Sequence, residues 1–199
     1  DIMNRFKGDR NQMFELLRLS MSDRRHRRID NEVIFPDGSS AWFELRFFPV
    51  PEGMCIFSVD ITARKRAERS LHDSEHRFNA FMDSLPPAAW MRDEHGRFVY
   101  VNKAWERTVG HTREQALSRT ASELLPPEVA RSAEEDDARL LGTGEDFRVI
   151  LQTSAFGGHE RWFQLTNFLF LDAAGARFSG GLGLEITAQK QLEEGLRRA

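Results

Sequence analysis

Cysteine is nearly absent from this sequence: Cys55 is the only one among 199 residues. A single thiol excludes an intrachain disulfide and a metal site built from several thiolates. We therefore expect a reducing environment and a cytoplasmic protein. Long apolar runs are lacking too, since none approaches the ~20 residues that a membrane-spanning helix needs, and no signal-peptide pattern is present. The sequence predicts no membrane contact for this stretch of chain.

An excess of positive charge is also lacking. The formal net charge is −3, which argues against nucleic acid as a partner. The arginine-rich stretch Ser22–Ile29 is short and has no interleaved aromatic residues, so a solvated loop is the preferred interpretation. The acidic run Glu134–Asp137 is similarly interpreted as the outer face of a helix.

Catalytic motifs are missing as well. The sequence has no Gly-x-Ser-x-Gly, no His-Glu-x-x-His and no phosphotransfer motif of a histidine kinase. The glycines of Gly180–Gly183 fall inside a predicted strand, which favours close packing or approach of a ligand over a phosphate-binding loop. His72 and His76 lie four residues apart without a third ligand nearby. We expect neither enzymatic activity nor a metal site.

What the sequence does contain is a repeat. Residues 40–68 reappear in altered form at 161–193. The landmarks in each copy are an aromatic pair and an acidic-Ile-Thr triplet: Trp42-Phe43 and Asp60-Ile61-Thr62 in the first, Trp162-Phe163 and Glu185-Ile186-Thr187 in the second. Such a repeat indicates that one structural unit is used twice.

The first unit, residues 1–62, is expected to be incomplete. It contains one predicted helix (12–21) and three predicted strands (29–35, 41–50 and 54–60), which make a poor closed core. The chain starts at Asp1 rather than Met, and the second unit is much longer before its matching turn. We therefore expect about forty more residues of this domain upstream in a longer protein.

The segment between the units predicts a helix over 63–84, because no Gly or Pro interrupts residues 61–85. Apolar or small residues recur at alternating intervals of four and three: Ala67, Leu71, Ser74, Phe78, Phe81 and Leu85. This heptad seam indicates a parallel homodimer formed through the linker helices. A helix that packs one stripe on its own domain is the alternative.

The second unit, residues 85–187, predicts an α+β fold. Two strands (88–93 and 97–102) are followed by short helices and then by three further strands. The expected helices are 103–109, 113–117 and 128–141, the expected strands are 146–153, 160–171 and 176–185, and an exit helix covers 188–199. Antiparallel strands with helices gathered between them predict a five-stranded antiparallel sheet with helices on one face.

Two stretches of this unit resemble the PAS sensor-domain family. They are Asp93-x-x-Gly96-x-Phe98-x-Tyr100-Val101-Asn102-x-Ala104-Trp105, with Gly110 after it, and the region from Trp162 to Ile186-Thr187. Asp60-Ile61-Thr62 is similar to the Asp-Ile-Thr terminus of the family. In the second copy, Glu185 replaces the usual Asp of this terminus. The resemblance implies tandem sensor domains of a bacterial signalling protein. It also implies an effector of the histidine kinase or diguanylate cyclase class in the same polypeptide.

The sequence does not identify a cofactor, and the preferred interpretation is that the chain binds none. Flavin photoreceptors of the family carry a cysteine in a region that corresponds to Leu117–Leu125, which has none. Haem-binding members supply a histidine from a region that corresponds to Glu128–Leu151, which has none either. A flavin- or haem-bearing receptor of light, redox state or gas is the alternative function.

Two sets of site residues follow. The first could line a small pocket, unless the core is filled and Asn102 bonds its own backbone: Trp90, Tyr100, Asn102, Trp105 and Asn167. The second is a signal junction at the start of each outgoing helix: Asp60, Ile61, Thr62, Glu185, Ile186 and Thr187. There the threonine hydroxyls are expected to cap the helices and the carboxylates to lie by their positive ends. Ion pairs with Arg64, Lys65 or Lys190 are expected for these carboxylates.

Overall fold

The computed structural model describes residues 10–198. The chain divides into two compact units, Asp1–His76 and Arg77–Ala199. The boundary lies within helix α2 (Thr62–Ser84), which matches the helix predicted for the linker. Each unit has a sheet of its own, with three strands in the first and five in the second.

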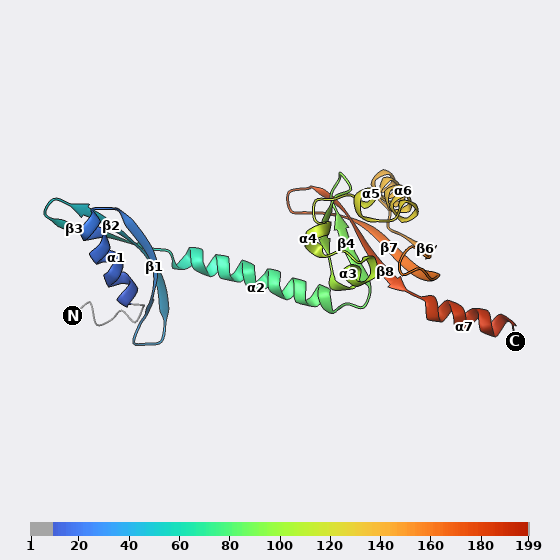
Figure 1. Ribbon diagram of the computed structural model, residues 1–199, viewed down its shortest axis with the longest axis horizontal. Coiled ribbons are helices and arrows are strands. Elements are labelled where there is room, and N and C mark those ends of the chain that lie inside the picture. The colour runs from blue at the N-terminus through green and yellow to red at the C-terminus, as the bar shows by residue number, and fades with distance from the viewer. Residues whose placement is uncertain (1–9, 199) are drawn as a thin grey trace. The chain divides into compact units, whose positions relative to one another are not determined.

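Unit 1 is a small antiparallel sheet with one helix on it (Figure 1). Its elements are α1 (Arg10–Asp23), β1 (Arg27–Ile34), β2 (Ser40–Val50) and β3 (Gly53–Asp60). Asn31 and Val33 of β1, and Leu45 and Phe47 of β2, are buried at alternate positions, as expected for a half-buried sheet, while Glu44 is buried as well. The core beneath α1 contains Val33, Leu45 and Phe47, with Ser20 from the helix.

Strand β3 has only one neighbour among the described residues, β2. Its apolar side chains Ile56, Phe57 and Val59 are 45–55% exposed. An edge strand with unprotected apolar residues is a template for pairing with another strand. Unit 1 therefore has an open side at β3.

Unit 2 is a five-stranded antiparallel sheet in the order β5-β4-β8-β7-β6, with the helices between β5 and β6 on one face (Figure 1). This confirms the predicted α+β class. Its strands are β4 (Ala88–Arg92), β5 (Phe98–Val101), β6 (Phe147–Thr153), β7 (Arg161–Leu171) and β8 (Arg177–Glu185). Its helices are α3 (Lys103–Val109), α4 (Arg113–Ala116), α5 (Ala121–Leu124), α6 (Pro127–Thr143) and α7 (Thr187–Arg198). Helix α5 is the one that the sequence did not predict.

Local signals explain where the short helices begin and end. Gly110 ends α3 in the left-handed conformation, with φ +86°, which glycine adopts readily because it has no Cβ atom. Thr112 and Gln115 form a capping box at the start of α4. These caps fix α3 and α4 against the sheet, where the core contains Phe98, Val101 and Trp105.

The glycines of β8 allow aromatic rings to lie on the strand. A Cβ atom on Gly181 would lie 2.2 Å from the indole of Trp90, and one on Gly180 would lie 2.3 Å from the ring of Phe168. The predicted close packing at these glycines is confirmed, and it places Trp90 flat against the centre of the sheet.

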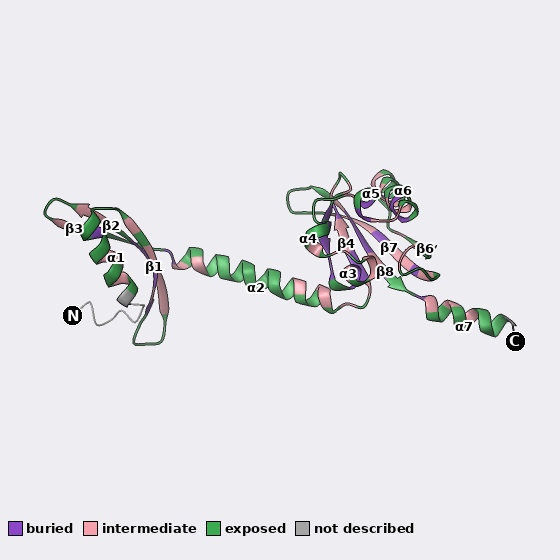
Figure 2. Cartoon of the chain, in the orientation of Figure 1, coloured by how far each residue is buried: buried purple, intermediate pink, exposed green. Residues whose placement is uncertain are grey.

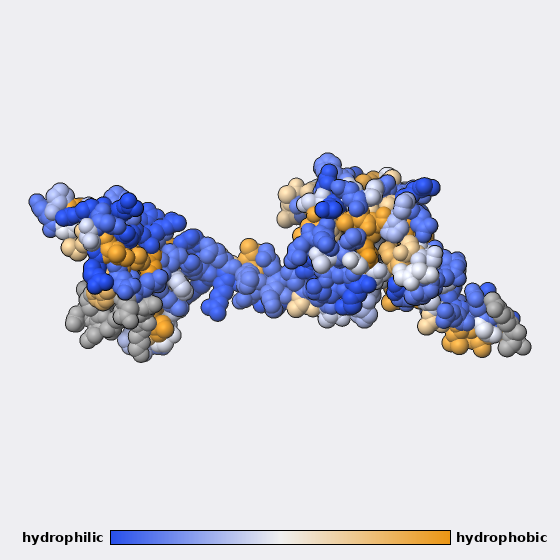
Figure 3. Space-filling view, in the orientation of Figure 1, coloured by the Kyte–Doolittle hydropathy of each residue, from blue (hydrophilic) through white to orange (hydrophobic). Residues whose placement is uncertain are grey.

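The two long connecting helices are mostly exposed. Figure 2 shows α2 exposed along most of its length, and none of its residues is buried. Figure 3 shows hydrophobic atoms on the surface of α7, whose Leu192 and Leu196 are more than 60% exposed. No helix in the described part of the chain is long and apolar enough to cross a membrane.

Candidate ligand pocket and helix junctions

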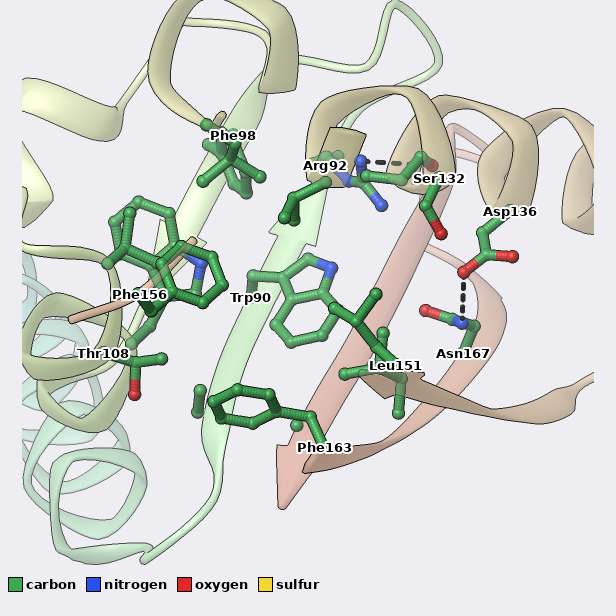
Figure 4. Close-up of a pocket in the computed structure, with 18 residues that line it drawn as sticks. Trp90, Arg92, Phe98, Thr108, Ser132, Asp136, Leu151, Phe156, Phe163 and Asn167 are labelled. Carbon is green, nitrogen blue, oxygen red and sulfur yellow. Dashed lines mark hydrogen bonds between the residues drawn. The ribbon is translucent and has the colours of Figure 1, made fainter. Parts of the chain in front are cut away.

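A cavity of about 80 Å³ lies in unit 2 between the sheet and helices α3 and α6 (Figure 4). The indole of Trp90 projects into its centre from β4, and Phe163 comes from β7. Leu151 of β6 and Phe156 complete an apolar wall. The cavity is thus an apolar pocket with a few polar groups, as small-molecule sites generally are.

Three of the five predicted pocket residues line this cavity: Trp90, Trp105 and Asn167. The other two do not, because β4 and β5 shift register between Met91 and Arg92. A strict alternation would put Phe98 and Tyr100 on one face. The irregularity leaves Phe98 in the pocket wall and turns Tyr100 away from it.

Asn102 is a structural residue rather than a pocket residue. Its Oδ1 accepts hydrogen bonds from the backbone amides of Ala89 and Trp105, both at 2.9 Å. Its Nδ2 donates to the carbonyl oxygens of Met82 and Pro87 at 2.9 and 3.0 Å. One fully buried amide therefore caps α3 and also ties the end of α2 to the sheet.

Tyr100 contacts the same end of α2. Its ring lies 5.4 Å from that of Phe78, and the guanidinium of Arg113 lies 4.9 Å from its centre. Arg113 also donates to Asp83 at 2.7 Å. Burial raises the pKa of Tyr100. The role of Arg113 was not predicted from the sequence, because its partner Asp83 lies thirty residues earlier in the chain.

A buried ion pair forms the polar end of the pocket. Arg92 is 2% exposed, and its guanidinium donates to Asp137 at 2.9 Å and to the carbonyl oxygen of Ala133 at 3.4 Å. Asn167 donates to the neighbouring Asp136 at 3.2 Å (Figure 4). Burial raises the pKa of both carboxyls, and the positive charge of Arg92 opposes that rise.

The assignment of Glu134–Asp137 to an outer face was therefore only half right. Glu134 and Glu135 are exposed, whereas Asp136 and Asp137 turn toward the sheet. A stripe at three- and four-residue spacing, containing Val129, Ala133, Asp136 and Leu140, would have indicated this. Arg92 could also have been found, since it shares the parity of Ala88 and Trp90 on β4.

The start of α7 is bonded to β7 through one residue. The amide of Trp162 donates to Thr187 Oγ1 at 3.0 Å, and its carbonyl oxygen accepts from the amide of Ile186 at 2.8 Å. In unit 1 the amide of Trp42 donates to Thr62 Oγ1 at 2.9 Å, and its carbonyl accepts from Ile61 at 2.8 Å.

The predicted capping role of the threonines was wrong, since these hydroxyls accept from a neighbouring strand instead of the helix amides. Asp60 accepts from the amide of Thr62, and hydrogen bonds from Thr62 hold the pKa of Asp60 below its usual range. Ile61 and Ile186 are both buried, at 8% and 9% exposure. The two junctions share the hydrogen bonds made by the tryptophan backbone, and they differ in the contacts of the carboxylate.

The expected ion pairs at the junctions do not form. Lys65 and Arg64 pair with Asp30, and Lys190 pairs with Glu193. Glu185 instead pairs with Arg161, whose Nε donates at 3.0 Å. This contact lowers the pKa of Glu185. The partner of Glu185 is thus on the adjacent strand β7, as the diagonal neighbour two residues before Phe163, which lies directly opposite Glu185.

Residues 82–191 match the protein-family model described as PAS fold. The chain belongs to the PAS family. An uncharacterised protein of Sinorhizobium fredii, y4lL, is 26% identical over 143 residues, covering 68% of this chain and 16% of that protein. The virulence sensor protein BvgS of Bordetella pertussis is 35% identical over 78 residues, covering 38% of this chain and 6% of that protein. The chain thus spans a small part of both relatives.

Among solved structures, the VqmA–ligand–DNA complex of Vibrio cholerae is similar to this chain with a TM-score of 0.51 and 23% identity. The match covers 54% of this chain and 50% of that chain. At this identity the likeness concerns the fold. The matched family region contains the whole of the pocket, the polar end and the junction at α7.

The predicted seam lies before and at the edge of this PAS region. Leu71 and Phe81 are each 62% exposed, and Ala67 and Ser74 are also exposed. The other two seam residues differ from these four. Phe78 packs on Tyr100 of the same chain, and Leu85 follows the end of α2.

Proposed function

We propose that the PAS unit is a sensory module that relays a change at its pocket, through α7, to an effector further along the same polypeptide. The effector would be of the histidine kinase or diguanylate cyclase class. The observation that carries this proposal is the position of Trp162. Its backbone holds the start of α7, and the next residue, Phe163, lines the pocket. The relation to a sensor protein supports the same role.

A ligand that shifts the backbone at Phe163 shifts β7, and this strains the hydrogen bonds that join Trp162 to Ile186 and Thr187 at the start of α7. A ligand shifts the equilibrium between two helix positions only by its differential affinity for them. Helix α7 exposes Leu192 and Leu196, so its surface is free to contact another element.

The test uses the longer protein with its natural output. Replacing Thr187 by Val removes the acceptor of the Trp162 amide, and replacing Glu185 by Ala removes the pair with Arg161. We expect this double variant to fold and to lose the dependence of output on stimulus. Lys190→Ala, which removes only an exposed pair within α7, is the matched control. Normal regulation in the double variant would remove the signalling role of the junction.

A tandem arrangement belongs to the same proposal: unit 1 would be the C-terminal portion of another PAS domain. The registers support it, since Phe43 pairs with Asp60 as Phe163 pairs with Glu185. Thr62→Val and Thr187→Val should therefore speed hydrogen exchange at the Trp42 and Trp162 amides by similar factors, about tenfold for one lost bond. A response in only one unit would contradict the shared junction.

The proposal includes a homodimer formed through α2. The exposed Leu71 and Phe81 support it, because an amphipathic helix normally covers its apolar stripe. Leu71→Glu should produce monomers in sedimentation experiments, whereas His72→Glu on the neighbouring face should not. Phe78 is a poorer choice, since its substitution also disturbs Tyr100. A dimer that survives Leu71→Glu and Phe81→Glu would exclude this seam.

The flavin- or haem-bearing alternative fits the pocket poorly. The residues that line it include neither His nor Cys, so no axial ligand or reactive thiol faces it. Its volume of about 80 Å³ is also below the ~300 Å³ at which pockets for drug-sized molecules begin. An absorbance spectrum of the purified chain checks this: a flavin or Soret band would restore the alternative.

A further inference from the structure

The pocket has two chemically different ends (Figure 4). Trp90, Phe163 and Leu151 form the apolar end, while Arg92, Ser132 and Asn167 gather at the other, beneath α6. A wall of this kind orients a ligand. The apolar part of the ligand packs against the aromatic rings, and its polar group binds the few fixed polar atoms.

The size of the cavity restricts the ligand to one small ring or its equivalent. The volume of about 80 Å³ is smaller than the ~150 Å³ of an engineered cavity that holds benzene. The close contact of Trp90 with Gly181 prevents the indole from receding into the sheet.

The charges of the polar end exclude an anion. The guanidinium of Arg92 is already paired with Asp137, and Asp136 adds a second carboxylate to the wall. A carboxylate ligand would meet two negative groups and one shared positive group in a partly buried site. Like charges at short range disfavour ionisation or binding.

The lining groups without a partner in the described part of the chain include two donors and one acceptor. The donors are the hydroxyl of Ser132 and the indole N–H of Trp90, which Figure 4 shows on the side of the polar end. The Nδ2 of Asn167 is used on Asp136, and Figure 4 shows its carbonyl oxygen turned toward the cavity. An unpaired buried donor is costly, and an acceptor supplied by a ligand would satisfy it.

We propose that the pocket takes a compact, neutral molecule of the amide or lactam type. Its carbonyl oxygen accepts from the hydroxyl of Ser132, its N–H donates to Asn167 Oδ1, and its apolar part lies against Trp90 and Phe163. This inference rests on the sensory function proposed above and names the chemistry that the pocket recognises.

The experiment titrates the intact chain with three small probes of similar size: 2-pyrrolidone, cyclopentanone and cyclobutanecarboxylate. The four tryptophans supply the readout through their indole N–H resonances. Trp90 and Trp105 line the pocket, and Trp42 and Trp162 do not. We expect 2-pyrrolidone to shift the first two signals in a saturable way. Cyclopentanone, which lacks the N–H, should bind about tenfold more weakly, and the carboxylate should not bind.

Variants locate the polar contact. Asn167→Leu should weaken 2-pyrrolidone about tenfold and leave cyclopentanone nearly unchanged, so that the two probes become equal. Thr166→Ala, next to it on the opposite face of β7, is the control. If Asn167→Leu does not fold, Ser132→Met places an apolar chain at the same end and should abolish binding of both probes.

Three outcomes would overturn the inference: carboxylate binding as tight as that of the lactam, equal binding of lactam and ketone to the unaltered chain, or no probe shift at Trp90 and Trp105. These results leave the proposed relay through α7 standing, because its test uses junction variants. Conversely, lactam binding together with unaltered regulation in the junction variant would retain the ligand class and reject the relay.

Discussion

Asn102→Ala is the substitution with the largest expected effect on unit 2. The change removes the acceptor of two buried backbone amides, those of Ala89 and Trp105. Loss of the cap on α3 costs about 1 kcal/mol, and an unsatisfied buried N–H costs about 2 kcal/mol. The free energy of unfolding should therefore fall by about 3 kcal/mol.

The assay must separate the two units, because a chain of two units need not unfold in one step. Heating can be followed through the indole signals of Trp42 in unit 1 and Trp105 in unit 2. Unit 2 spans residues 77–199, a size for which 1 kcal/mol corresponds to about 4 °C. Trp105 should lose its native signal about 12 °C earlier, with Trp42 unchanged.

Asn79→Ala is the control, since Asn79 lies on α2, the helix whose end Asn102 holds, and makes only a 3.5 Å contact with Arg113. It should change stability by about 0.5 kcal/mol or less. If Asn102→Ala behaved like this control, the amides of Ala89 and Trp105 would have other partners, and the role given to Asn102 would be refuted.

Three further predictions test single features of unit 2. Tyr100→Phe should leave urea stability unchanged or raise it by up to about 1 kcal/mol, because the buried hydroxyl has no partner among the described residues; a clear loss would contradict this. Gly181→Ala should cost about 1–3 kcal/mol by forcing the indole of Trp90 away, whereas Gly142→Ala in α6, with open space around it, should not destabilise. Glu185→Gln tests the pair with Arg161, which lowers the pKa of Glu185. A lowered pKa in the folded state means stability that is present above the usual carboxyl pKa and lost as pH falls through the lowered one. The stability difference between the unaltered chain and Glu185→Gln should be constant from about pH 6 to 8 and shrink in acid; a difference that grows in acid would refute the pairing.

Local signals in the sequence were sufficient for most of the secondary structure and for the fold class. Alternation in residues 161–171, the uninterrupted helix before Pro86 and the caps at Gly110 and Thr112 all depend on neighbours within a few positions. The repeat also located both junctions correctly, because Trp42 and Trp162 stand at matching places relative to Thr62 and Thr187.

The contents of the site depended on the tertiary structure. The irregular register between β4 and β5 decided that Phe98 faces the pocket and Tyr100 does not. The pairing of Arg92 with Asp137 joins residues forty-five positions apart, and no local pattern reports such a contact. The sequence by itself therefore determined the elements and their order, since these follow from periodicity and capping. Only the packing of α6 on the sheet decided which polar groups meet, because that choice depends on side chains brought together from distant parts of the chain.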